Sequence, residues 1–251
     1  MGLRTLHALV VFVCLGAPLL LPATGCSRPS PSQAPTSTNV VIQTADGLLL
    51  ESTLYHVDHE APPGLVLLHD LGGDRHVWQR FARQAQQRGY ACVAPNLRGH
   101  GHAPPSYRSF THNDWRAAVD DITGAIDALT AAGASPQDIG IVGAGLGASI
   151  ALHFALDHEQ VACLVLVSPG VNDKGLGTEN EIAAYGRRPV LLVTTEGDAY
   201  SAATCSTLKR NAQDLCELVE FAGTAHGTDI FAILPDAIPQ TIRWLDLVLG
   251  D

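Results

Sequence analysis

From Val40 to its end, the chain alternates short apolar runs with segments of helical periodicity. The runs are typical of strands buried on both faces of a sheet, and they cover 40–44, 48–55, 65–69, 90–94, 139–142, 161–167, 190–194 and 215–221. Helical spacing predicts helices over 78–88, 114–132, 146–157, 179–185, 199–211 and 235–249. Asp46-Gly47 is a hairpin signal between the first two runs. These elements predict one α/β domain, an open and mostly parallel sheet with helices on both faces.

The first 25 residues have the layout of an export signal. Arg4 precedes an apolar run over 6–21, which is broken by glycine and proline and is short for a spanning helix. The run ends in Ala23-Thr24-Gly25-Cys26, which resembles a bacterial lipoprotein signal, although Ala23 departs from the usual leucine. That resemblance implies cleavage before Cys26 and its lipidation. An ordinary signal peptide or an uncleaved anchor are the alternatives.

The segment after Cys26 is rich in proline, serine and threonine and has no apolar periodicity. Such a composition cannot bury enough surface to offset the entropy lost on ordering, so it predicts an extended tether. We therefore divide the chain into a lipoprotein signal (1–25), a tether (26–39) and a folded α/β domain (40–251). An exported protein held at the membrane only by a lipid anchor would have this organisation.

Composition excludes some partners. The chain has 251 residues, of which 46% are hydrophobic, and that fraction suffices for a packed core. The formal net charge is −10, and Lys174 and Lys209 are the only lysines. No basic stripe is available for a nucleic-acid backbone. Arg28 is the only strong base of the tether, so a polybasic membrane patch is not expected either.

The chain has six cysteines: Cys14 lies in the predicted signal, Cys26 begins the tether, and the other four lie in the folded domain. Cys92 and Cys163 lie in apolar runs and are expected to be buried. Cys205 and Cys216 flank a helical segment and could form a disulfide in an oxidising compartment. No cysteine or histidine spacing is typical of zinc, so we expect neither a metal nor a cofactor. His100 and His102 lack a partnering carboxylate or cysteine at suitable spacing.

Three motifs at strand ends together resemble the α/β-hydrolase superfamily. His69-Asp70-Leu71-Gly72-Gly73 resembles the His-Gly-x-Gly-Gly turn, whose backbone N–H, here that of Leu71, helps to bind an oxyanion. The segment 96–101, Asn-Leu-Arg-Gly-His-Gly, resembles the Asp-x-Arg-Gly-x-Gly turn of the same superfamily, with asparagine for aspartate. The third motif, in 139–147, takes the place of the nucleophile elbow. The resemblance covers about 40–250 and implies an α/β-hydrolase fold.

The elbow departs from the family pattern at the nucleophile. Where the family has Gly-x-Ser-x-Gly, this chain has Gly143-Ala144-Gly145-Leu146-Gly147, so Gly145 stands at the serine position. Glycine tolerates the positive φ of such a turn but offers no hydroxyl. The resemblance assigns the second oxyanion N–H to Leu146. We expect Gly145→Ser to restore modest esterase activity if the rest of the site is intact.

The acid and the base of the family triad have counterparts here. Asp198 follows the run at 190–194, and His226 follows the run at 215–221, in the family order of nucleophile, acid and base. A carboxylate fixes the imidazole tautomer and leaves the other ring nitrogen free to take a proton. The resemblance therefore implies an Asp198–His226 dyad. Helix capping by Asp198 and a loop hydrogen bond by His226 are the alternative roles.

Other residues are weaker candidates for the missing group. Ser149 lies one turn inside the helix, where its hydroxyl is expected to bond back to the helix backbone. Ser168 is expected to be a turn residue, and Asp173 is a candidate substitute acid. About 20 residues separate the strands at 161–167 and 190–194, too few for a lid domain, so the resemblance is to small lidless esterases and dienelactone hydrolases, with an open cleft.

Three functions remain open at this point. The first is a degenerate homologue, non-hydrolytic or strongly impaired, that binds a small-molecule ligand or a protein partner in the former cleft. The second is an active hydrolase of ester or amide bonds with an unrecognised nucleophile. The third is general-base chemistry by His226 and Asp198 alone. The vacant serine position at Gly145 favours the first.

We predict that mature protein extracted from membranes begins at Cys26 and carries a diacylglycerol-type modification there. The reason is the apolar run ending in small residues before Cys26, followed by a tether. Intact mass and N-terminal peptide mapping test this. A mature chain that begins elsewhere and partitions wholly into the aqueous fraction would contradict it.

Overall fold

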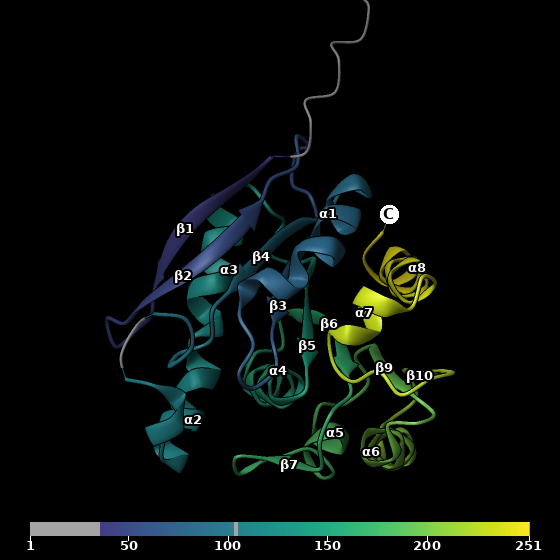
Figure 1. The fold of residues 1–251 in the computed structure, drawn as a ribbon. Helices are drawn as coiled ribbons and strands as arrows, with labels where there is room; N and C mark the ends of the chain where they lie inside the picture. Colours follow the sequence, from purple (N-terminus) through teal and green to yellow (C-terminus); the bar gives the residue numbers. More distant parts are fainter. Residues whose placement is uncertain (1–35, 103–104, 251) are drawn as a thin grey trace, which may run out of the picture. The chain divides into compact units, whose positions relative to one another are not determined.

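The computed structural model describes residues 36–102 and 105–250 (Figure 1), so the predicted signal and Cys26 lie outside the described residues. Eight strands form one sheet in the order β1-β2-β4-β3-β5-β6-β9-β10. They are β1 (Ser37–Gln43), β2 (Leu49–Tyr55), β3 (Gly64–Leu68), β4 (Ala91–Pro95), β5 (Ile139–Ala144), β6 (Val161–Val167), β9 (Val190–Thr195) and β10 (Cys216–Phe221). The pairs β1–β2 and β2–β4 are antiparallel, and every other neighbouring pair is parallel.

Helices cover both faces of this sheet (Figure 1). The helical segments are η1 (Arg75–Trp78), α1 (Gln79–Gln87), η2 (Tyr107–Ser109), α2 (His112–Asp120), α3 (Ile122–Ala131), α4 (Leu146–Asp157), α5 (Glu181–Ala184), α6 (Ala199–Asn211), α7 (Asp229–Ile233) and α8 (Ala237–Leu249). A small hairpin, β7 (Asn172–Asp173) with β8 (Leu176–Gly177), lies between β6 and α5.

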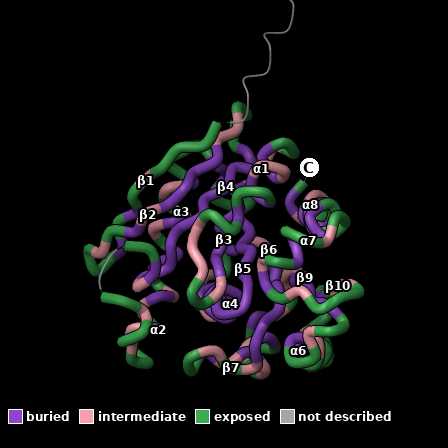
Figure 2. Tube along the Cα trace, viewed as in Figure 1, coloured by how far each residue is buried: buried purple, intermediate pink, exposed green. Residues whose placement is uncertain are grey.

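The period of two along the central strands divides the core into two layers. In β3, Val66 and Leu68 pack in the layer of α2, α3, α4 and α6, whereas Leu65 and Leu67 pack in the layer of α1, α7 and α8. All five residues of β3 are buried, and Figure 2 shows buried backbone along the centre of the sheet. The continuous apolar runs of the sequence therefore belong to strands covered on both faces, as expected.

Some element boundaries differ from the prediction. β1 begins at Ser37, inside the segment assigned to the tether, and pairs with β2 from there. The helix predicted over 114–132 is divided into α2 and α3 at Asp121, whose carboxylate is bonded to the buried Arg98. α2 begins earlier than expected because Thr111 caps it in a capping box, in which Asp114 is the third helical residue.

This topology brings distant loops to one edge of the sheet. The loops that follow β3, β5, β9 and β10 all leave the carboxyl ends of parallel strands. Those loops carry Asp70, Gly145, Asp198 and His226. Carboxyl ends of parallel strands are the usual place of binding sites in open α/β sheets. Among the helices of 36–102 and 105–250, none is long and apolar enough to cross a membrane.

Candidate functional site

The turn between β5 and α4 has the shape of a strained elbow. Gly145 adopts φ 49° and ψ −118°, a conformation that L-residues rarely enter. A Cβ at Gly143 would overlap the backbone of Gly147, and one at Gly147 would overlap the backbone of Leu68. The two flanking glycines are therefore required by close backbone approach, which supports the predicted backbone shape of the elbow.

The space in front of Gly145 is filled by the carboxylate of Asp70. A Cβ at Gly145 would lie well inside van der Waals contact with both carboxylate oxygens of Asp70. Oδ1 of Asp70 accepts hydrogen bonds from the backbone N–H of Leu71 at 2.6 Å and of Leu146 at 2.8 Å. These are the two N–H groups that the family resemblance assigns to oxyanion binding, and they do converge on one point. That point is occupied by an anion of the protein itself.

The N-terminus of α4 contributes to this arrangement. Leu146 is the first residue of the helix, so its N–H has no acceptor within the helix and points toward the Asp70 carboxylate. The positive end of the helix dipole favours a negative charge there. Burial alone would raise the pKa of Asp70, but hydrogen bonds from His226 and the two amides outweigh it and lower the pKa. Asp70 is consequently a carboxylate at neutral pH.

Asp198 and His226 lie together as predicted. Nδ1 of His226 donates to Oδ2 of Asp198 at 2.6 Å, and Asp198 also caps α6 by accepting from the N–H of Ser201 at 3.4 Å. The capping and the pairing roles are therefore both present. On its other side, Nε2 of His226 lies 3.4 Å from Oδ2 of Asp70. The three side chains form a row, Asp70–His226–Asp198, which we call the carboxylate–imidazole row.

Two carboxylates hold the imidazole in its charged form. The pKa of His226 is raised to about 9, first by Asp70 and, against partial burial, also by Asp198. His226 is therefore an imidazolium at neutral pH and cannot accept a proton until it has lost one. The pKa of Asp198 is lowered, because the hydrogen bond with His226 outweighs the effect of burial.

Two neutral histidines fix the loop that carries Asp70. His69 is fully buried, and burial lowers its pKa to about 4. Its Nε2 accepts from the N–H of Leu97 at 3.0 Å, so Nδ1 carries the proton and donates to the Asp70 carbonyl at 2.7 Å. Nε2 of His100 accepts from the N–H of Gly72 at 3.1 Å. The loops after β3 and β4 are thereby bonded to each other on both sides of Asp70.

The second sequence motif has a structural role. The guanidinium of Arg98 pairs with the buried Asp121, at 2.7 Å from Nε to Oδ2, and with Asp46. Oδ1 of Asn96 accepts from the N–H of Arg75 at 2.8 Å. These contacts attach the loop after β4 to the first hairpin and to η1. None of them reaches the carboxylate–imidazole row.

The other sequence candidates lie elsewhere or take different roles. Ser149 does not bond back to its helix: it donates to Oδ2 of Asp173 at 2.7 Å. Asp173 therefore accepts a hydrogen bond from Ser149. Among the described residues, Asp198 and not Asp173 is the carboxylate bonded to Nδ1 of His226. Ser168 has φ 46° and its hydroxyl accepts from the N–H of Gly227 at 2.9 Å. Ser168 is thus a turn residue, as expected, and one that positions the loop of His226.

The cysteines of the described residues and the question of a metal site can be considered together. In the part of the chain that the structure describes, no group of three or more His, Cys, Asp or Glu side chains has a metal-binding arrangement. Cys205 and Cys216 are both buried free thiols in this structure, so the disulfide considered for them is not formed. Cys92 and Cys163 are buried in the core, as predicted. Burial raises the pKa of both thiols, so they are unreactive.

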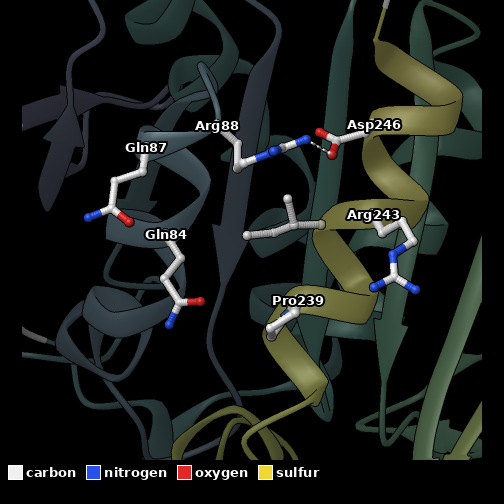
Figure 3. A pocket seen from close by; sticks show the side chains of 7 residues that line it. Gln84, Gln87, Arg88, Pro239, Arg243 and Asp246 are labelled. Carbon is white, nitrogen blue, oxygen red and sulfur yellow. Dashed lines mark hydrogen bonds and ion pairs between the residues drawn. The ribbon is translucent and has the colours of Figure 1, made fainter.

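Two hollows bear on where a ligand fits. One of about 620 Å³ lies between α1 and α8, where Figure 3 shows polar side chains and the Arg88–Asp246 ion pair around it. It is on the α1–α8 side of the sheet and contains no member of the carboxylate–imidazole row. A second hollow, of about 530 Å³, is bounded by 72–74, 99–102 and 106–108. It also contains no member of the carboxylate–imidazole row, but residues 72–74 follow Asp70 in the same loop. We call it the cleft hollow.

Comparisons with known proteins agree with this fold. The sequence profile described as Alpha/beta hydrolase family matches residues 65–250. The chain belongs to the alpha/beta hydrolase family. A thermostable monoacylglycerol lipase of Bacillus sp. (strain H-257) is 26% identical over 111 residues, which cover 44% of this chain and 42% of the lipase. The matching segment thus spans less than half the length of that relative.

Solved structures resemble the fold of this alpha/beta hydrolase. An esterase of Pyrococcus furiosus superposes with a TM-score of 0.69 at 18% identity, covering 86% of this chain and 94% of the esterase. An acetyl xylan esterase from Paenibacillus sp. R4 gives 0.73 at 16% identity, over 88% and 87% of the two chains. A dienelactone hydrolase from Anabaena variabilis gives 0.66 at 18% identity, over 86% and 97%. At these identities the likeness extends to the fold alone.

Sequence reasoning missed Asp70 as a member of the site. The motif at 69–73 has aspartate where the family turn has its first glycine, and the elbow has glycine where the family has serine. These two departures are reciprocal, because the side chain absent at Gly145 leaves the space that the Asp70 carboxylate fills. Considering the two departures together would have identified Asp70.

The overlap changes the expectation for Gly145→Ser. We now predict that Gly145→Ser alone stays at background esterase activity, and that Asp70→Gly combined with Gly145→Ser hydrolyses short-chain esters. Glycine at position 70 frees the N–H groups of Leu71 and Leu146 and makes room for the hydroxyl. Because loss of one oxyanion donor costs on the order of 10²–10³ in kcat, the double variant should exceed each single variant by about 10² or more.

The matched controls for this exchange are Asp70→Gly alone, which has no nucleophile, and the double variant with His226→Ala, which has no base. Both should remain at background in a p-nitrophenyl acetate assay. Equal activity in Gly145→Ser with and without Asp70→Gly would show that Asp70 does not block the elbow.

A second prediction concerns the charge of His226. Its imidazole should titrate near pH 9 by NMR of the ring Cε1 proton, and Asp70→Asn should lower that midpoint, since Asp70 is the first cause of the raised pKa. A pKa raised on folding stabilises the fold fully below the unfolded value of about 6.5. That stabilisation is lost as pH rises through about 9. The free energy of unfolding should therefore decline more between pH 7 and 10 in the wild type than in His226→Gln.

Proposed function

We propose that this alpha/beta hydrolase does not cleave esters through a serine acyl-enzyme and instead binds a small ligand in the cleft beside Asp70. One observation carries the proposal: the Asp70 carboxylate accepts both N–H groups of Leu71 and Leu146 in front of Gly145. A degenerate site, impaired as an esterase, is the function that this geometry supports best.

Acyl transfer needs two things that the site does not offer together. It needs an activated hydroxyl or thiol, and Gly145 has no side chain at the elbow. It also needs hydrogen-bond donors aimed at the oxygen that becomes negative in the transition state. Here those donors are already bonded to a carboxylate, which would also repel the developing charge. Both deficits act on the same step, so substrate binding alone would not lead to hydrolysis.

General-base chemistry by His226 and Asp198 alone is less well supported. A base must be free of its proton at the working pH, and the pKa of His226 is raised to about 9 by the carboxylates on both sides. At neutral pH only a small fraction of the imidazole is unprotonated. The row therefore favours a role for His226 as a cation and a proton donor.

The charges of the row and the size of the cleft hollow indicate the kind of ligand. Two carboxylates and one imidazolium leave a net negative charge on the row, and the hollow of about 530 Å³ begins two residues after Asp70 in the same loop. An uncharged or cationic small molecule is favoured over an anion there. A protein partner in the same cleft is the second candidate, and nothing in the net charge of −10 supports a nucleic-acid partner.

The proposed setting is the cell envelope. A lipid on Cys26 would be the only membrane attachment, with the folded domain outside the bilayer. This part of the proposal depends on the resemblance of 1–26 to a lipoprotein signal.

Esters are the first compounds to test, because a relative is a lipase and structural neighbours are esterases. We predict that the full mature chain forms no covalent adduct with a fluorophosphonate probe and that a panel of short-chain esters is not turned over. Intact mass spectrometry measures the adduct. The double variant Asp70→Gly/Gly145→Ser, labelled in parallel, is the positive control for a competent fold. Stoichiometric labelling of the wild type at Ser149, Ser168 or any other residue would overturn the proposal.

A further inference from the structure

We propose that the surface formed by α1 and α8 is the side of the domain that lies on the membrane, where it contacts the headgroups of anionic phospholipids. This inference goes beyond the proposed ligand of the cleft and rests on the proposed membrane setting, in which a lipid on Cys26 is the anchor. It is carried by a group of arginines on the helix that binds the start of β1. The contact is with headgroups only, so the lipid remains the only attachment within the bilayer.

The exposed side of α1 is basic. Positions 75–88 contain four arginines and no aspartate or glutamate, in a chain whose formal net charge is −10. The buried residues of α1 are Phe81, Ala82, Ala85 and Gln86. Because an α-helix has 3.6 residues per turn, Arg80, Arg83 and Arg88 project from the opposite side of this helix. α1 thus presents a positive surface on a protein of negative net charge.

α8 adds a fourth guanidinium to this surface. Arg243 lines the hollow of about 620 Å³ between the two helices, and Figure 3 shows its guanidinium directed away from the Arg88–Asp246 ion pair. Among the described residues, neither Arg83 nor Arg243 has an ion-pair partner. The carboxylates of α8, Asp246 and its N-cap Asp236, are fewer than the arginines. We call the four the arginine face: Arg80, Arg83, Arg88 and Arg243.

The chain leaves the folded domain beside the same helix. Nε2 of Gln86, on α1, donates to the backbone carbonyl of Thr36 at 2.8 Å. About ten residues separate Thr36 from Cys26, and a fully extended chain of that length spans at most about 35 Å. A lipid on Cys26 would therefore hold α1 within that distance of the bilayer. A tether this short gives even a weak contact a high effective concentration of its partner.

The hollow between α1 and α8 suits the chemistry of a phospholipid headgroup. A guanidinium donates two parallel hydrogen bonds to a phosphate, and Arg243 brings such a group to the hollow. The carboxamides of Gln84 and Gln87 line the same hollow and can bond to the hydroxyls of a glycerol headgroup. Charge and hydrogen-bonding groups therefore both favour an anionic headgroup at this place.

Exposed aliphatic side chains border the arginine face. Leu247 lies one turn after Arg243 on α8 and is 80% exposed. Ile233 is 65% exposed and follows Ala232, whose carbonyl accepts from the guanidinium of Arg80 at 2.6 Å. Basic residues with aliphatic neighbours are typical of surfaces that lie at the headgroup layer of a membrane. Contact with that layer would remove part of both aliphatic side chains from water.

Footprinting of arginines on vesicles tests the orientation. The mature chain is coupled through the Cys26 thiol to a maleimide lipid, since its other four cysteines are buried. Phenylglyoxal then modifies accessible guanidiniums, which peptide mass spectrometry locates. With phosphatidylglycerol in the vesicles, the arginine face should be modified several-fold less than on pure phosphatidylcholine. Arg116 on α2 and Arg210 on α6 should be modified equally on both, because α2 and α6 cover the other face of the sheet.

Removal of matched charges tests the cause of the protection. An arginine near an anionic surface contributes about fivefold to binding, so Arg83→Gln with Arg243→Gln should abolish the protection of the remaining two arginines. Arg116→Gln with Arg210→Gln removes the same net charge from the other side of the sheet and should leave the protection unchanged. Arg243→Gln alone, at an exposed position that the fold does not depend on, should weaken the protection about fivefold.

Three results would overturn this inference. They are equal modification of the arginine face on the two kinds of vesicle, equal protection on both sides of the sheet, and protection that survives removal of Arg83 and Arg243. A native mature chain without a lipid on Cys26 would reject the membrane setting and this inference with it. Fluorophosphonate labelling of the wild type would instead reject the ligand-binding cleft and leave the arginine face in place, so the two proposals fail separately.

Discussion

The hydrogen bonds from the N–H groups of Leu71 and Leu146 to the Asp70 carboxylate are the constraint on which the rest of the site depends. They tie the loop after β3 to the first turn of α4, and they place an anion where the elbow would present a side chain. A Cβ at position 145 would overlap that anion, so any larger residue there needs the Asp70 carboxylate to move. His226 is charged because of it, since Asp70 is the first cause of its raised pKa.

The fold brings the loops of the site together, and His69 and His100 fix the position of the loop that carries Asp70. Parallel strands bring the loops after β3, β5, β9 and β10 to one edge of the sheet, which is enough to collect the residues. Their exact placement depends on buried hydrogen bonds. His69 accepts from the N–H of Leu97 and donates to the Asp70 carbonyl, and His100 accepts from the N–H of Gly72. A buried neutral histidine is well suited to this, because one nitrogen donates and the other accepts. The site is thus held by groups that themselves take no part in its charge.

The sequence predicted most of the fold and two of the three residues of the row. α4, β6 and α6 begin and end where periodicity placed them. The Asp198–His226 contact was predicted from chain order and strand ends. The division of the helix at Asp121 was missed, and the contact of this residue with Arg98 is a long-range one that no local pattern contains. Asp70 was missed for the same reason: its partner Leu146 is 76 positions away, and single-sequence patterns carry no such contact.

The overlap between position 145 and the Asp70 carboxylate also bears on the history of this chain. Steric coupling of this kind makes the effect of one substitution depend on the residue at the other site. An ancestor with glycine at 70 and serine at 145 would lose its function at the first change in either order, and a descendant would regain nothing by reversing only one. Selection for ester hydrolysis therefore offers no stepwise return, and the two positions are expected to be inherited as a pair in the lineage to which this chain belongs.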